Sequence, residues 1–269
     1  MPIGPFESEV LHTLASQRNP DSYIGGATVL HQSPDSPRSS ADIDVFHDTV
    51  DAVQRAVTTD LKTLQGAGYC VEVTSQQESF CRAIVTKGEL ATKLEWVQDS
   101  AFRFFPVEPD VEMGWRLNFW DAATNKILAF GSREKLRDWV DVMYLHNRHL
   151  PVGALVWAAA GKDAGLTPEL LLDSAKRFSQ FSIQAADWNR LQMSPPGDPV
   201  RFKQQFLQAI AAAEMLIAKL PPAEMGCLYL GPDGKPVCPD PEQSDFKRLT
   251  RHFGSIKGAW PRIVGSPMR

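Results

Sequence analysis

The stretch IGGATVL at residues 24–30, followed after a short loop by RSSADIDVF at residues 38–46, decides the fold. Successive side chains of a strand point to opposite faces, so Asp42 and Asp44 are predicted to share one face of a strand. Two carboxylates on one face suit a divalent cation, and Mg²⁺ prefers one or two carboxylates plus the phosphates of a substrate. The stretch therefore predicts a metal site that receives a phosphorylated ligand.

The residues before this acidic pair add to the same scheme. Gly25-Gly26 lets the backbone approach a ligand without a Cβ in the way. If Ala27 opens a helix, the free amides of that helix would face an anion such as a triphosphate. Arg38 lies between the two segments and can reach phosphate with its guanidinium. Taken singly, a glycine pair is usually a turn and a DxD is usually a pair of solvated acids, but their order across one loop is far more specific.

The composition bounds the class of protein. The chain has 269 residues, of which 43% are hydrophobic and 22% charged, with a formal net charge of −4. These values are typical of a globular protein and exclude a disordered or fibrous one; they give no general basic character for nucleic-acid binding. We expect a cytoplasmic protein without a membrane segment, because no basic-then-apolar leader is present and the longest apolar run, VGALVWAAAG at residues 152–161, is too short to span a membrane. Four cysteines without a CxxC pair argue against a zinc site and against a disulfide framework.

The pattern of apolar residues predicts an α+β fold in two domains. Residues 1–150 alternate strands and helices, which indicates a mixed sheet flanked by helices, and residues 151–269 form a mainly helical C-terminal domain. The predicted strands are ADIDVF (41–46), YCVEVTS (69–75), FCRAIVT (80–86) and TKLEWV (92–97). The predicted helices include one capped by Asp48 or Thr49, one over residues 132–147, one that starts at Thr167-Pro168, one over 200–220 and one over 245–253, with a hairpin around Asp233-Gly234.

Three motifs resemble a known family. They are the glycine pair followed by R-x-S-x-D-I-D-V-F, the strand Lys93-Leu94-Glu95, and NKILAFGSREKLRDWVDVMYL, in which the matching positions are Lys126, Arg133, Arg137, Asp138 and Asp141. The chain resembles the AbiEii/AbiGii-type toxins of the DNA polymerase β-like nucleotidyltransferase superfamily over residues 20 to 148. The resemblance implies a nucleotidyltransferase fold. It departs at Ala27, where the family often has Ser or Thr.

The resemblance also implies roles for individual residues. Nucleotide binding falls to Gly25, Gly26, Thr28, Arg38, Lys93 and Lys126, metal binding to Asp42, Asp44 and Glu95, and catalysis to Asp42, Asp44, Glu95 and Asp138. The implied cofactor is Mg²⁺ or Mn²⁺. The implied reaction moves a nucleoside monophosphate from a nucleoside triphosphate to the 3′ end of a tRNA or to a protein hydroxyl, with an antitoxin protein as a further partner.

Other interpretations remain open at this level. The DxD also fits a nucleotide-sugar glycosyltransferase, and Ala27 allows a family member that binds a nucleotide or a partner without catalysis. His47 completes a D-x-D-x-x-H pattern but fits a histidine at a strand end better. Arg137 and Asp141, four residues apart, are interpreted as a surface ion pair, and Trp96 as a core residue rather than a platform for base stacking.

Overall fold

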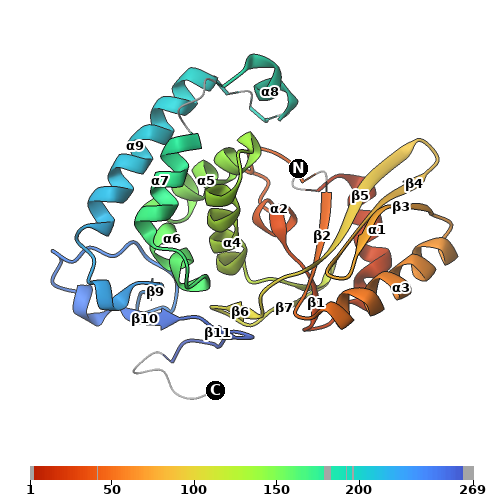
Figure 1. The fold of residues 1–269 in the computed structure, drawn as a ribbon, viewed down its shortest axis with the longest axis horizontal. Helices are drawn as coiled ribbons and strands as arrows, with labels where there is room; N and C mark the ends of the chain where they lie inside the picture. Colours follow the sequence, from red (N-terminus) through yellow and green to blue (C-terminus); the bar gives the residue numbers. More distant parts are fainter. Residues whose placement is uncertain (1–2, 41, 179–182, 192, 196, 263–269) are drawn as a thin grey trace. The chain divides into compact units, whose positions relative to one another are not determined.

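The computed structural model describes residues 3–40, 42–178, 183–191, 193–195 and 197–262. The chain forms two compact units (Figure 1). The sheet unit comprises Met1–Ala101 and Pro106–Ala122, and the helical unit comprises Phe102–Phe105 and Ala123–Arg269. This division differs from a boundary at residue 150. The helix before that residue belongs with the helices after it, because its Trp139 ring stacks on Phe206 at 5.0 Å between centroids.

The sheet unit is built on a seven-stranded mixed sheet in the order β3-β4-β5-β2-β1-β8-β7. The pairs β3–β4, β4–β5, β1–β2 and β7–β8 are antiparallel, whereas β2–β5 and β1–β8 are parallel. This confirms the predicted mixed sheet. The elements of the unit are α1 (Pro5–Leu14), β1 (Ser22–Ile24), α2 (Gly26–Leu30), β2 (Asp42–His47), α3 (Val50–Gly66), β3 (Cys70–Gln77), β4 (Phe80–Lys87), β5 (Leu90–Gln98), β7 (Glu108–Asp110) and β8 (Gly114–Arg116). The predicted strand at residues 41–46 corresponds to β2, and Ala41 lies outside the described residues.

The two faces of this sheet have opposite character. Alternate residues of β2, β4 and β5 are buried, including Ile43, Ala83 and Leu94, and α1 and α3 pack against that face (Figure 1). The residues between them, such as Asp42 and Glu95, are partly exposed. One face therefore forms the core of the unit, and the other is left for polar chemistry.

The start of helix α3 agrees with the sequence prediction, whereas the middle of the helix contains a buried acidic residue that the sequence did not predict. Thr49 accepts a hydrogen bond from the amide of Ala52 at 3.2 Å, which confirms the predicted cap. In the middle of the helix, Asp60 is fully buried. Its carboxylate accepts a hydrogen bond from Trp96 Nε1 at 2.7 Å and forms an ion pair with the equally buried Arg18. Trp96 is thus a core residue, as predicted.

This buried polar chain continues to His47. Arg18 also donates to Ser22 Oγ at 2.9 Å, and Ser22 Oγ lies 3.1 Å from His47 Nε2. Burial, and then the nearby charge of Arg18, lower the pKa of His47 to about 4. The D-x-D-x-x-H pattern therefore does not form a metal set with the acids, because His47 faces the core while Asp42 and Asp44 face the other side of β2.

The low pKa of His47 gives a pH dependence of stability. The folded state keeps this imidazole neutral, whereas the unfolded chain protonates it near pH 6.5. The free energy of unfolding therefore does not suffer from His47 protonation above pH 6.5. As the pH falls from 6.5 towards 4, protonation of His47 in the unfolded chain lowers the free energy of unfolding by roughly 2–3 kcal/mol. In urea unfolding with EDTA, the wild type is expected to lose this much more stability than His47→Gln between pH 7 and pH 4.5. Parallel pH curves for the two proteins would contradict the assignment.

The helical unit contains a helix that is wholly buried. The apolar run at residues 152–161 forms α6 (Val152–Ala159), which is buried on every side and packs against α5, α7, α9 and β9. The remaining elements are β6 (Phe102–Arg103), most of α4 (Phe119–Ser132), α5 (Leu136–Arg148), α7 (Pro168–Phe178), α8 (Ala185–Arg190), α9 (Pro199–Ile217), β9 (Cys227–Leu230), β10 (Thr250–Phe253) and β11 (Ser255–Ile256). The amide of Leu170 donates to Thr167 Oγ1 at 3.2 Å, which confirms the predicted start of α7.

Two predictions for this unit are wrong in detail. The helix expected over residues 132–147 starts only at Leu136, because Lys135 is extended and ends the connection from α4. The helix expected over residues 245–253 is a single 3-10 turn followed by strand β10. Strand β10 pairs antiparallel with β9, which buries His252 and lets its Nε2 hydrogen-bond to the carbonyl of Phe104 at 2.8 Å. Tertiary pairing overrides the local helical preference here.

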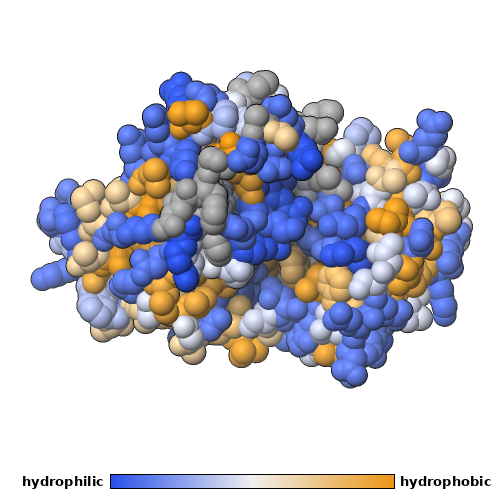
Figure 2. Space-filling view, turned by 45° about the horizontal axis from the view of Figure 1, so that its top comes forward, coloured by the Kyte–Doolittle hydropathy of each residue, from blue (hydrophilic) through white to orange (hydrophobic). Residues whose placement is uncertain are grey.

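Some large apolar side chains are exposed on the surface. Figure 2 shows apolar residues as separated spots among hydrophilic ones on the face in view, and single exposed side chains such as Val200 and Met215 are normal for a globular protein. Within the described part of the chain, no helix combines the length and the apolar character that crossing a membrane requires. The four cysteines are all free.

Candidate functional site

The glycine pair and the second acidic residue lie against each other. The amide of Gly25 donates to the carbonyl of Asp44 at 3.1 Å, which ties the turn to β2. Gly26 has a φ of +63°, and a Cβ at this position would overlap Oδ2 of Asp44. A Cβ at Gly25 would overlap the ring of Phe46. Both positions therefore require glycine, one for its backbone angle and both for the close approach.

The next two predicted nucleotide ligands hold the loop in shape. Thr28 is buried, and its hydroxyl donates to the carbonyl of Asp42 at 3.2 Å, so it secures α2 to β2 rather than pointing its hydroxyl outward. Arg38 is partly exposed in the loop before β2, where its guanidinium donates to the carbonyl of Ser39 at 3.1 Å. Thr28 thus hydrogen-bonds to the backbone of β2, and Arg38 hydrogen-bonds to the backbone of its own loop.

A row of alternating charges crosses three neighbouring strands on the polar face of the sheet. Lys93 Nζ lies 2.9 Å from Asp42 Oδ2 and 3.1 Å from Glu95 Oε1, and Glu95 Oε1 also accepts from Arg82 Nε at 2.7 Å. Burial lowers the pKa of Lys93, but hydrogen bonds to Asp42 and Glu95 outweigh burial and raise the pKa above its ordinary value. Lys93 therefore remains a cation between two carboxylates.

The ion pairs of this row indicate which of the acidic residues could bind a metal ion. Among the described residues, no three His, Cys, Asp or Glu side chains gather as a metal-binding group. The two acids of β2 nevertheless share the polar face, and the Lys93 ammonium beside Asp42 shows that this face accepts a cation. Asp42 and Asp44 therefore fit a hard divalent cation through their oxygens. Glu95 is engaged by two basic side chains instead.

Arg82 is the member of the row that the sequence analysis did not single out. It is paired directly with Glu95 in the β4–β5 register. The sequence did contain a signal for Arg82. If the two predicted strands are joined by a tight turn at Gly88, counting residues back from the turn on each strand places Arg82 opposite Glu95. Arg82 and Glu95 both belong to the alternating residues that face away from the core.

Four predicted residues of the third motif form a charged cluster in the helical unit, in which Lys126, Asp138 and Asp141 are buried and Arg133 is exposed. Lys126 Nζ lies 2.8 Å from Asp138 Oδ1 and 3.0 Å from Asp141 Oδ2, and Arg133 Nε lies 2.8 Å from Asp138 Oδ2. Burial would raise the pKa of Asp138, but Lys126 and Arg133 outweigh it and lower the pKa below its ordinary value. The interpretation of Asp141 as part of a surface ion pair is wrong, because Asp141 is fully buried and pairs with Lys126.

These three groups of residues lie within the part of the chain that matches a known family. Residues 11–212 match the family model described as nucleotidyl transferase AbiEii toxin, type IV toxin–antitoxin system. The chain belongs to the AbiEii family. It is accordingly a toxin-like nucleotidyltransferase, which confirms the predicted family and enzyme class. The glycosyltransferase interpretation is set aside by this membership.

Two solved structures are similar to this AbiEii-family chain, and one of them supports its fold. MenT4, a nucleotidyltransferase toxin from Mycobacterium tuberculosis, is similar with a TM-score of 0.51 at 13% identity, covering 81% of this chain and 83% of its own. JHP933 from Helicobacter pylori gives a TM-score of 0.46 at 18% identity, covering 78% and 89%. No curated protein matches the chain. At this identity, the likeness to MenT4 shows the fold alone.

Gly26 offers a direct test of the turn in this AbiEii-family chain. Gly26→Ala is expected to lower nucleotide-transfer activity at least about tenfold, because the new methyl group must displace the Asp44 carboxylate. Gly88→Ala is the matched control, since Gly88 has a nearly equal φ of +64° but nothing within 4 Å of the added Cβ. Both variants should lose about 1 kcal/mol of stability from the backbone angle. Equal activity of the two variants would argue against a role for the turn.

Proposed function

We propose that this protein transfers a nucleoside monophosphate from a nucleoside triphosphate to a hydroxyl group of an RNA or protein acceptor. The hydroxyl oxygen attacks the α-phosphorus, a new P–O bond forms, and pyrophosphate leaves. The observation that carries the proposal is the contact between the Gly26 turn and the Asp44 carboxylate, beside the charge row that begins at Asp42. That arrangement joins a surface for close phosphate approach to a pair of acidic residues.

The residues of the sheet unit have distinct proposed tasks. The Gly25-Gly26 turn receives the triphosphate, and Lys93 neutralises part of its charge after leaving Asp42. Glu95 accepts the proton of the attacking hydroxyl, and Thr28 keeps the turn in position through its bond to the Asp42 carbonyl. Arg38 is proposed to reach the phosphates from its loop.

Mg²⁺ or Mn²⁺ is the proposed cofactor. Asp42 and Asp44 would hold the ion, with Glu95 as a further ligand only if it exchanges its basic partners. When bound, the ion supplies positive charge to the phosphates of the displacement. Two hard carboxylates on one polar strand face support this choice.

The helical-unit residues Lys126 and Asp138 are proposed to act in the same reaction. Lys126 would contribute positive charge towards the nucleotide, and Asp138 would hold Lys126 in place through their 2.8 Å ion pair. Because Asp138 is fully buried, its proposed contribution to catalysis is through this partner.

The biological setting follows from the family as a proposal. The acceptor is the 3′ end of a tRNA or a protein hydroxyl, the protein acts in the cytoplasm, and an antitoxin opposes it. The membership of the chain in a toxin–antitoxin family supports an antitoxin partner and a nucleotide substrate.

A transfer assay tests the reaction. The protein is incubated with Mg²⁺ and each α-labelled nucleoside triphosphate in turn, once with total RNA and once with cell protein. Label in one fraction, absent with Asp44→Ala, would establish the transfer and name the acceptor class. No label in either fraction with any triphosphate would contradict the proposed reaction.

A further inference from the structure

Arg82 has unused hydrogen-bonding capacity beside Glu95, the proposed base. It donates to Glu95 through Nε, while its two terminal guanidinium nitrogens are not buried and bond to none of the described residues. The Arg82 side chain is 43% exposed. Glu95 likewise has one oxygen in use, because Arg82 and Lys93 both contact Oε1 and no described residue contacts Oε2. A donor fork and a carboxylate oxygen therefore lie next to each other on the polar face of the sheet, both able to bind a ligand.

Arg82 lies at the end of a line of functional positions that crosses the sheet. Asp44 pairs with Glu95 in the β2–β5 register, and Glu95 pairs with Arg82 in the β4–β5 register. The Gly26 turn meets Asp44 and follows β1, which neighbours β2 on the side away from β5. The order across the sheet is thus the Gly26 turn, Asp44, Glu95 and Arg82. Because neighbouring strands are about 4.8 Å apart, Arg82 lies roughly 10 Å from Asp44 along this line.

This order indicates the side from which an acceptor approaches. In the proposed reaction, the triphosphate rests on the Gly26 turn, and Glu95 takes the proton of the attacking hydroxyl. The attacking oxygen and the leaving pyrophosphate lie roughly in line on opposite sides of the α-phosphorus. With pyrophosphate at the turn, the acceptor comes from the β4 side of Glu95, where Arg82 is exposed.

The surroundings of Arg82 suit an RNA strand. The planar guanidinium fork matches the geometry of a phosphate. Its Cζ lies 5.2 Å from the centroid of the Phe80 ring, and Phe80 is partly exposed two residues away on the same face of β4. The cross-strand neighbours of Phe80, which are Gln77 and Val97, carry no charge. Bases of single-stranded RNA stack on aromatic rings and on guanidinium planes, so this pair matches a phosphodiester joined to a base.

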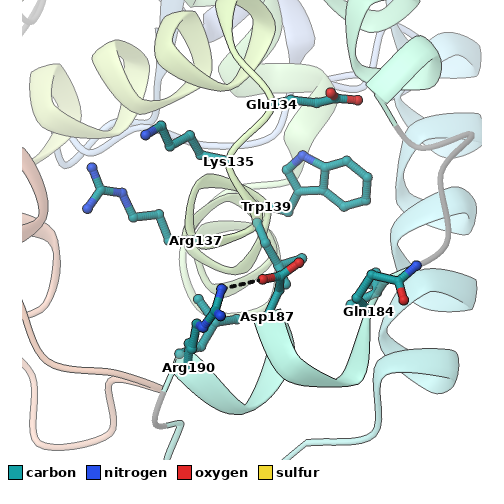
Figure 3. Close-up of a pocket in the computed structure, with 10 residues that line it drawn as sticks. Glu134, Lys135, Arg137, Trp139, Gln184, Asp187 and Arg190 are labelled. Atoms are coloured by element: carbon teal, nitrogen blue, oxygen red, sulfur yellow. Dashed lines mark hydrogen bonds and ion pairs between the residues drawn. The ribbon is translucent and has the colours of Figure 1, made fainter.

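The helical unit contains a cavity of about 620 Å³ at the first turn of α5, which fits an acceptor less well. Two acids, Glu134 and Asp187, line it among the basic residues (Figure 3). Asp187 already pairs with Arg190 at 2.9 Å. None of the residues proposed for the reaction lines this cavity, so a hydroxyl bound there would have no base beside it.

We propose that Arg82 and Phe80 form the subsite for the 3′-terminal nucleotides of an RNA acceptor, with a phosphodiester on the terminal nitrogens of Arg82 and a base against Phe80. The terminal hydroxyl then lies at Oε2 of Glu95. The inference rests on the proposed function for the position of the triphosphate. It deepens that function, because it selects RNA rather than protein as the acceptor.

Binding measured without turnover tests the subsite. A fluorescein-labelled oligoribonucleotide with a free 3′ hydroxyl is titrated with the full chain in EDTA, without triphosphate, and its anisotropy is recorded. Arg82→Gln should raise the Kd about three- to tenfold, and it should reduce the slope of log Kd against log salt by about 0.7, as the loss of one phosphate contact requires. Arg55→Gln is the matched control and should bind as the wild type does, because Arg55 is exposed on α3, which packs against the other face of the sheet.

Steady-state rates separate acceptor binding from triphosphate binding. Arg82→Gln should raise the KM for RNA about three- to tenfold and leave the KM for the triphosphate unchanged, and Arg82→Lys should recover part of the loss because it keeps the charge without the fork. Unchanged RNA affinity in Arg82→Gln, an equal loss in Arg55→Gln, or label transferred to protein instead of RNA would overturn the proposal. If Arg82→Gln weakens RNA binding but no label is transferred in the wild type, the subsite is supported and the proposed reaction is contradicted.

Discussion

Asp44→Asn is expected to lower the rate of nucleotide transfer about a thousandfold, which corresponds to roughly 4 kcal/mol of lost transition-state stabilisation. The change keeps the size of the side chain and removes its charge at the position where the carboxylate touches the Gly26 turn. It thereby removes one of the two acids proposed to hold the divalent cation. Initial rates of pyrophosphate release measure the effect.

The control for this experiment removes a carboxylate from the same sheet. Glu72 lies exposed on the edge strand β3 and takes part in none of the ion pairs of the charge row, and Glu72→Gln should retain the wild-type rate. The melting temperature of Asp44→Asn should stay close to that of the wild type, since Asp44 lies on the polar face of the sheet rather than in the core. A rate within about tenfold of the wild type would refute the proposed role of Asp44.

Asp60→Asn is expected to lower the free energy of unfolding by about 3–5 kcal/mol. The substitution leaves the buried Arg18 guanidinium without its counter-charge, and it weakens the hydrogen bond from Trp96, the neighbour of Glu95 on β5. Urea unfolding followed by tryptophan fluorescence measures the loss. The effect is large because both members of the ion pair are shielded from water, which would otherwise solvate the remaining charge.

The same helix provides the control for Asp60. Asp51 is exposed in the first turn of α3, so Asp51→Asn makes the same chemical change in solvent and should cost less than about 1 kcal/mol. If the two variants lost equal stability, the buried ion pair would not contribute as the structure indicates.

The local motifs were predictable because their spacing is set by backbone geometry. Alternation along β2 places Asp42 and Asp44 on one face, and the same rule places Lys93 beside Glu95 on β5. The cap at Thr49 was likewise predictable, since it depends only on residues within one turn of the helix. The family pattern then tied these motifs to nucleotidyl transfer.

Other features depend on contacts between segments far apart in the sequence. Asp60 looks like a solvated residue in a helix, and only its burial against Arg18 and Trp96 makes it part of the core. The strand at residues 250–253 forms because β9 offers a partner, although the local sequence favours a helix. Neither outcome follows from propensity, because the deciding free energy comes from pairing and burial.

By itself, then, the sequence determined the sheet-forming motifs, the family and the positions of the acidic pair, because each rests on short-range spacing. Only the tertiary structure decided that Lys93 bridges Asp42 and Glu95, and that Asp60 is buried against Arg18 and Trp96. These features arise where side chains from separate elements meet. The packing of the whole unit determines which of these side chains lie close enough to form ion pairs and hydrogen bonds.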